Sequence, residues 1–305
     1  MYCDTLAEFR DSLYLCFERA GDALMNTADA LLTETAARSR PELSLSPCFE
    51  RKWHSLYEAF ADAQINRCHL QRVFAAFIPR PQPGQRLVLG VDASSIARPQ
   101  SQTAQDRTYV SAANLPEGSK PVVAGWQFSS LCVLPDTPSS WTYVLDIQRI
   151  ESAATAAATA ACQLTAVLSR LSVLPQEAGT PLLLGDGAYG TVTFLQATAD
   201  LPCDKLLRFA KNRVLYRPAP PPSGKRGAPK KDGDVFLCKD TATHGTPDAA
   251  WAGTDAHGQA VEVACWHTLH FKKARTLTVS VIRVTRHGAA DTKRDPRVSW
   301  FVFAG

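Results

Sequence analysis

The sequence predicts a mixed α/β protein preceded by a helical segment, and three observations support this fold class. Apolar residues recur at helical spacing through the first eighty residues. Two short apolar runs, Arg86–Ser95 and Pro181–Gly190, have the character of buried strands. Between them, an Ala-rich stretch from about Ile150 to Leu174 predicts one long helix that ends before Pro175. Strands that alternate with a long helix are typical of a mixed α/β sheet.

The composition is that of a globular protein with about two average domains, or one large domain that carries an insertion. The chain has 305 residues, of which 45% are hydrophobic and 20% charged, and this balance excludes extensive disorder. The longest uncharged stretch, Ser152–Ser169, is too rich in small and hydroxyl side chains for a membrane span. Asp4, Glu8 and Asp11 stand where a signal peptide would carry positive charge. We therefore expect a cytoplasmic protein without a membrane segment.

Residues 1–80 are predicted to form a small helical domain. One helical pattern runs from Leu6 to about Thr35 and a second from about Phe49 to Phe77, and a Pro/Gly-rich linker follows at 79–84. Such a module can bind DNA or pack on its neighbour. Because no helix-turn-helix signature is present, packing is slightly favoured.

Beyond residue 84 the pattern becomes extended. A short helix is expected at Thr191–Ala199, and a Pro/Gly-rich basic loop at Pro218–Asp234. The remaining predicted strands are Thr108–Val110, Pro121–Val133, Trp141–Asp146, Leu206–Tyr216, Val235–Leu237, Val261–His270, Leu277–Val284 and Ser299–Gly305.

The charge is distributed unevenly along the chain. Residues 1–200 carry 15 basic and 20 acidic side chains, whereas residues 201–305 carry 18 basic and 9 acidic ones. A basic block of this size suits a polyanionic partner, because each Lys or Arg on a phosphate releases condensed counterions. Solubility alone is the other explanation of the same charge.

The nine cysteines are spread along the chain without a CxxC pair, which argues against a disulfide framework. Cys48, His54, Cys68 and His69 lie close enough in sequence to raise the question of a metal site. Their spacing fits no zinc finger, so reduced structural thiols are the favoured interpretation.

Asp92 and Asp186 are the candidate catalytic and metal-binding residues. Each follows an apolar strand and has small neighbours, in VLGVDAS and LLLGDGAYG. Ligands of open α/β sheets bind at the carboxyl ends of strands. Two carboxylates there can share Mg²⁺ or Mn²⁺, and a pair of ions about 3.5–4 Å apart would stabilise the attacking and leaving oxygens of a phosphodiester. The alternative is that each aspartate caps a helix or closes a turn.

Several motifs occur together in a fixed order. They are GVDAS at 90–94, GDGAYG at 185–190, RFAKNRVLY at 208–216, GKRGAPKK at 224–231 and WFVFAG at 300–305. In this order and spacing the chain resembles the transposases of bacterial insertion sequences that have a DDE catalytic domain with an RNase H-like fold.

The resemblance implies an RNase H-like core at 85–202, a basic β-rich insertion at 203–298 and a strand at 299–305 that returns to the core. Asp92 and Asp186 would be the family's first two acids, and would hold Mg²⁺ or Mn²⁺ for cleavage and strand transfer of DNA, at the element ends and at the target. The oligomeric state stays open, a homo-oligomer included. The residues expected to hold the DNA backbone are Arg208, Lys211, Arg213, Lys225, Arg226, Lys230 and Lys231.

The third acid of this family is a glutamate on a helix that follows the insertion, and no such helix precedes Gly305. Glu262 is the only glutamate after Asp186, and the valines on both sides of it predict a solvent-facing strand residue. The expectation is therefore a transposase that is truncated before its third acid and impaired in activity.

Other functions remain as alternatives. One is a catalytically inactive DNA-binding remnant of a transposase, and another is a nuclease of the same fold without a role in transposition. A Ser–His–Asp hydrolase is disfavoured because no G-x-S-x-G motif is present. Tyr189, three residues after Asp186, either packs beside the metal site or fills the core.

Overall fold

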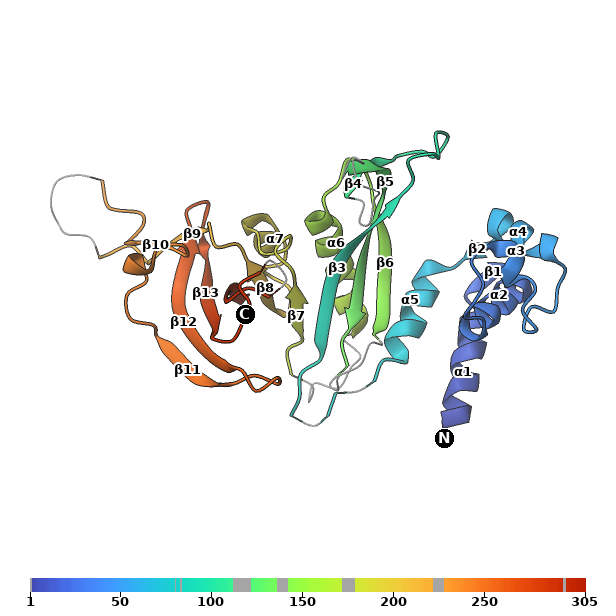
Figure 1. The fold of residues 1–305 in the computed structure, drawn as a ribbon, viewed down its shortest axis with the longest axis horizontal. Coiled ribbons are helices and arrows are strands. Elements are labelled where there is room, and N and C mark those ends of the chain that lie inside the picture. The colour runs from blue at the N-terminus through green and yellow to red at the C-terminus, as the bar shows by residue number, and fades with distance from the viewer. Residues whose placement is uncertain are drawn as a thin grey trace. The chain divides into compact units, whose positions relative to one another are not determined.

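The computed structural model describes residues 2–79, 81–82, 84–111, 122–135, 142–171, 179–221, 228–292 and 295–305. The chain forms two compact units, Met1–Pro79 and Arg80–Gly305 (Figure 1). Two of the predicted DNA-binding residues, Lys225 and Arg226, lie outside the described residues. Across these ranges, every helix is too short or too polar to cross a membrane.

The first unit is mainly helical and has a small core of its own. Ala30, Leu43, Phe49 and Leu56 are buried together in it. Its elements are α1 (Tyr2–Tyr14), β1 (Phe17–Arg19), α2 (Gly21–Thr33), α3 (Arg40–Leu43), α4 (Trp53–Asp62), β2 (Gln64–Ile65) and α5 (Arg67–Ala76).

The two long helices predicted for this unit are each interrupted, so that prediction is wrong in its detail. Strands β1 and β2 pair with each other, with Phe17 opposite Ile65. Ala20 has a left-handed backbone with φ 61°, which ends one segment and starts α2 in a new direction. Helical spacing of apolar residues cannot reveal this break, because the pairing joins segments almost fifty residues apart.

The second unit begins with a mixed sheet in the spatial order β6-β5-β3-β7-β8. Strands β3, β5 and β6 are antiparallel neighbours, whereas β7 is parallel to both β3 and β8. Helix α6 packs along β5 and β6 (Figure 1). The predicted mixed α/β, RNase H-like fold is therefore confirmed. The elements are β3 (Val88–Ala97), β4 (Thr108–Ser111), β5 (Val122–Val133), β6 (Tyr143–Ile150), α6 (Ala156–Leu171), β7 (Leu182–Gly185), α7 (Val192–Ala197) and β8 (Asp204–Phe209).

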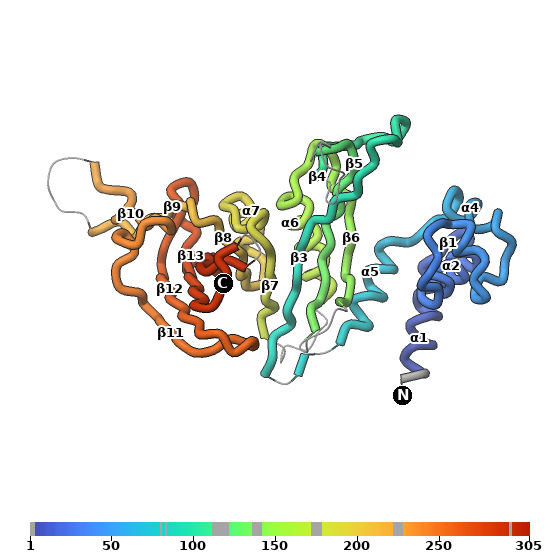
Figure 2. Tube along the Cα trace, in the orientation of Figure 1, coloured from blue at the N-terminus to red at the C-terminus, as the bar shows by residue number. Residues whose placement is uncertain are grey.

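The strands after β8 extend the same sheet. Strand β14 lies between β8 and β13, and the order continues through β12 and β9 to β10, while β11 pairs along β12. The long β12–β13 hairpin is strongly curved (Figure 2). The elements are β9 (Val214–Tyr216), β10 (Val235–Leu237), a 3₁₀ turn (Thr241–Thr243), β11 (Ala249–Thr254), β12 (Ala260–Phe271), β13 (Ala274–Arg286) and β14 (Val298–Ala304).

An aromatic cluster fills the core of this extended part. The rings of Phe236, His244, Trp266 and Trp300 lie with centroids 4.6–6.3 Å apart. His244 is almost fully buried, and its Nε2 lies 2.8 Å from the carbonyl oxygen of Leu237. Burial lowers the pKa of the His244 imidazole, because the charged form would lose its hydration.

Candidate active site

Asp92 and Asp186 lie at the same level on two neighbouring strands, β3 and β7. Strands β3 and β7 pair in parallel with Val91 opposite Gly185, and each aspartate is the next residue along its strand direction. Parallel neighbours lie about 4.8 Å apart. Both aspartates are exposed. The structure therefore brings together the two acids that the sequence placed 94 residues apart.

Asp92 lies within its strand, whereas the sequence suggested a strand end. Strand β3 continues to Ala97 because β5 pairs with it along this whole length. Leu89 and Val91 point to the buried face, and Asp92 alternates to the exposed face. Within the described ranges its carboxylate makes no hydrogen bond or ion pair, so both of its oxygens are open to a ligand.

Asp186 is oriented by its own turn, which we call the Asp186 turn (residues 186–189). Its Oδ1 accepts a hydrogen bond of 2.8 Å from the backbone N–H of Ala188, and its carbonyl oxygen accepts one of 3.2 Å from Tyr189. The turn is followed by Gly190, where a Cβ atom would lie 2.1 Å from the carbonyl oxygen of Arg208. Only glycine allows this close approach of the turn to β8.

Arg208 stands at the same level on the next strand. Strands β7 and β8 pair with Gly185 opposite Leu207, so Arg208 and Asp186 are the following residues on the two strands. Leu207 is fully buried and Arg208 is exposed, in keeping with strand alternation. The order β8-β7-β3 thus presents Arg208, Asp186 and Asp92 in a row across the sheet, at the level where β7 ends, and we call this row the acidic edge.

The other predicted DNA-binding residues are more dispersed. Lys211 is exposed in the turn after β8. Arg213 is half-buried, with its guanidinium 5.8 Å from the ring centre of Phe209, so part of its role is packing. Lys230 and Lys231 are exposed in the connection between β9 and β10, five strands from β7 in the sheet order.

The base of that connection is held by an ion-pair cluster. Asp232 accepts hydrogen bonds of 2.7 and 2.9 Å from Arg275, and its Oδ1 lies 3.0 Å from Nε2 of His270. Arg275, and to a smaller degree His270, hold the pKa of the Asp232 carboxyl well below its usual range. This cluster anchors the residues next to Lys230 and Lys231.

Glu262 does not join the two aspartates. It lies on β12, four strands from β7 in the sheet order, and its exposed carboxylate is 3.0 Å from His287. The prediction of a solvent-facing strand residue is confirmed. Within the part of the chain that the structure describes, His, Cys, Asp and Glu side chains form no group of three that could hold a metal ion.

Asp92 and Asp186 nevertheless fit a hard divalent cation. They offer carboxylate oxygens, which Mg²⁺ and Mn²⁺ prefer, at an exposed edge with room for water and substrate. Mg²⁺ is typically held by one or two carboxylates, and waters and substrate oxygens complete its coordination. The donor chemistry therefore matches such an ion even without a third acid.

Several polar residues are buried near this edge, and all of them except Tyr189 were not identified from the sequence. Tyr189, which the sequence left open between two roles, is fully buried, with its ring 5.5 Å from Phe194. Ser129, Asp146 and Gln163 are buried near it. Gln163 gave no signal, because it is one polar residue in an Ala-rich helix and nothing in the pattern distinguishes a buried position from an exposed one.

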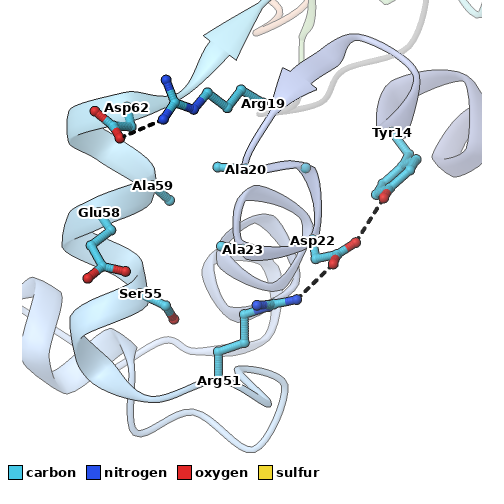
Figure 3. Close-up of a pocket in the computed structure, with 11 residues that line it drawn as sticks. Tyr14, Arg19, Ala20, Asp22, Ala23, Arg51, Ser55, Glu58, Ala59 and Asp62 are labelled. Carbon is cyan, nitrogen blue, oxygen red and sulfur yellow. Dashed lines mark hydrogen bonds and ion pairs between the residues drawn. The ribbon is translucent and has the colours of Figure 1, made fainter.

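A separate pocket of about 390 Å³ lies in the first unit, between α2 and α4 (Figure 3). Its charged walls pair with one another. Arg19 binds Asp62 at 3.1 Å, and Asp22 accepts hydrogen bonds from Arg51 at 2.7 Å and from Tyr14 at 2.8 Å (Figure 3). These pairs join α2 to α1 and to the segment before α4, and they join β1 to the end of α4.

Two acidic side chains in register on an RNase H-like sheet are an arrangement compatible with metal-dependent cleavage of phosphodiesters, as in nucleases. The family model described as DDE superfamily endonuclease matches residues 12–269, which is more than half of the chain, and the chain belongs to this family. The comparison with curated proteins gives no match. The family supports a nuclease or transposase-type function with DNA as the substrate, and enzymes of this superfamily typically use divalent metal ions.

Proposed function

We propose that the chain is a transposase of a bacterial insertion sequence, which cleaves and transfers DNA strands in a reaction that depends on Mg²⁺ or Mn²⁺. The observation that carries this proposal is the alignment of Asp92 and Asp186 on the parallel strands β3 and β7. The order of the five sequence motifs supports it further. The division into a core at 85–202, an insertion at 203–298 and a returning strand at 299–305 is part of the same proposal.

Each residue at the edge has a distinct role in this function. Asp92 and Asp186 would hold the cation, with the Asp186 turn fixing the direction of one carboxylate. A bound divalent ion would stabilise the charge on the attacking and leaving oxygens of a phosphodiester. Arg208, one strand away, would bind the phosphate backbone beside the two acids, and its register with Asp186 supports this role. Lys211, Lys230, Lys231 and the half-buried Arg213, which lie in the connections after β8 and β9, would add further contacts to the DNA backbone.

Impaired activity is part of the proposal. The described residues supply two carboxylates to this edge, and Glu262 is engaged elsewhere. An ion with fewer protein ligands binds more weakly and is positioned less well, and catalysis of phosphoryl transfer depends on positioning and charge stabilisation. We therefore expect slow cleavage.

A nicking assay on supercoiled DNA tests the proposal. The wild-type chain with Mg²⁺ or Mn²⁺ is expected to convert supercoiled to open-circular DNA, and Asp92→Ala and Asp186→Ala to abolish this conversion. Asp200→Ala is the matched control, because Asp200 is an exposed aspartate in the same unit, beyond the end of α7. Nicking that is equal in all four proteins, or that resists EDTA, would contradict the assignment.

A catalytically inactive DNA-binding remnant is the second candidate, and the two-acid edge is the observation that favours it. Salt-sensitive DNA binding without nicking by the wild type would support this candidate. A nuclease without a transposition role would nick DNA but would not join a labelled 3′-end to a target duplex. A strand-transfer assay with labelled DNA ends distinguishes it from a transposase.

A further inference from the structure

A layer of buried polar side chains lies between the sheet and α6, next to the acidic edge. Ser129, Gln163 and Tyr189 are fully buried, and Asp146 is 5% exposed. Ser129 pairs across β5 and β3 with Ala93, the residue that follows Asp92. Nε2 of Gln163 donates hydrogen bonds of 3.1 Å to the Ser129 carbonyl oxygen and 2.9 Å to Oδ2 of Asp146. The layer thus joins α6 to β6 and to β5, the strand that pairs with β3.

Three oxygens in this layer have no hydrogen-bond partner among the described residues. They are Oγ of Ser129, Oε1 of Gln163 and the hydroxyl of Tyr189. An unpartnered polar atom in a core costs free energy, and phenylalanine would fill the same ring volume without that cost. The tyrosine hydroxyl is therefore unlike an ordinary core atom.

Tyr189 is connected directly to the acidic edge. Its backbone N–H closes the Asp186 turn, and its ring packs edge-on against Phe194 of α7. Burial raises the pKa of the Tyr189 phenol to about 12, the nearby Ser129 hydroxyl opposes this rise, and the charges of Asp92 and Asp186 add to it.

We propose that Tyr189 is a positioning residue: its backbone N–H closes the Asp186 turn, its ring is held against Phe194, and its hydroxyl lies in the same buried polar layer as Ser129, and together these contacts anchor the turn for cation binding. The anchor sets the direction in which Asp186 presents its Oδ2 to the ion, since Oδ1 already accepts the Ala188 N–H. The inference rests on the proposed role of Asp92 and Asp186 as cation ligands. It adds a residue that does not touch the ion but determines how well the ion is held.

Mn²⁺ binding to the full chain, followed by electron paramagnetic resonance, tests this inference without a requirement for activity. Tyr189→Phe is expected to raise the Kd for Mn²⁺ by about tenfold or more, as loss of an outer partner of a ligand typically does. Its urea midpoint should be equal to or above that of the wild type, because an unpartnered hydroxyl is removed. Ser129→Ala should weaken Mn²⁺ binding in the same direction. Tyr216→Phe, which alters a half-buried tyrosine on β9, should bind Mn²⁺ as the wild type does.

The outcomes separate this inference from the proposed function. If Asp186→Asn loses Mn²⁺ binding while Tyr189→Phe binds as the wild type does, the positioning role is overturned and the cation site stands. If the wild type itself does not bind Mn²⁺, both are overturned. A weaker affinity in Tyr189→Phe that follows a lower urea midpoint, and that Ser129→Ala does not share, would show a structural role only.

Discussion

Substitution of Gly190 by alanine is expected to push the Asp186 turn away from strand β8. The added Cβ would lie 2.1 Å from the carbonyl oxygen of Arg208, about 0.9 Å inside the 3.0 Å limit that real Cβ contacts respect. That oxygen belongs to the backbone of β8, which is paired on both sides with β7 and β14, so it cannot move aside as a flexible side chain would. Such overpacking costs about 1–3 kcal/mol.

The expected change is measurable by urea unfolding. With an m-value of about 2–3 kcal/mol/M, the midpoint should fall by about 0.3–1.5 M. A displacement of about 0.9 Å also exceeds the tolerance of about 0.5 Å within which binding groups have to be held, so Mn²⁺ affinity should fall as well. Gly187→Ala is the matched control, because nothing lies within 4 Å of a Cβ at that position. Equal midpoints for the Gly187→Ala and Gly190→Ala proteins would refute the packing argument.

Three further predictions concern other parts of the second unit. Because burial lowers the pKa of His244, its imidazole favours the folded state only while neutral. The unfolding free energy should therefore fall as pH drops below the ordinary histidine value of about 6.5, and His244→Phe should flatten this dependence in urea titrations at pH 5–8. Lys230→Ala combined with Lys231→Ala should reduce the slope of log K against log salt for duplex DNA by about 2, and an unchanged slope would remove both residues from the interface. The depressed pKa of Asp232 contributes stability above about pH 4, which is lost as pH falls through the lower folded value. Asp232→Asn should therefore lose less stability between pH 5 and 3 than the wild type does, and should speed amide exchange beside Arg275.

The strands that carry the two aspartates could be predicted because each begins as a short apolar run. Val88–Ala97 and Leu182–Gly185 are buried on at least one face, and buried strands consist largely of apolar residues, which can be recognised in the sequence. Strand β11 was missed, because apart from the exposed Trp251 its residues Ala249–Thr254 are small and mostly exposed, and its pairing is with β12. The hydrophobic pattern of a segment cannot predict a strand that forms because of its pairing with a neighbouring strand.

The candidate site was predicted in part for similar reasons. Asp92 and Asp186 were found because acidic residues beside buried strands are unusual in a local window. Their register with Arg208 could not be predicted, because it depends on pairings between segments that are far apart in the chain. The burial of Ser129 and Gln163 could likewise not be predicted, because it depends on how α6 packs on the sheet.

The uninterrupted sheet from β10 to β3 has a mechanical consequence. Strand β14 hydrogen-bonds to β8 through five residue pairs, and β8 to β7 through four more. A hinge between the basic strands and the acidic edge would have to break these backbone bonds together. If duplex DNA binds near Lys230, as we propose, it would lie at a set offset from Asp92, and bending of the DNA, rather than closure of the protein, would have to bring distant phosphates to the carboxylates.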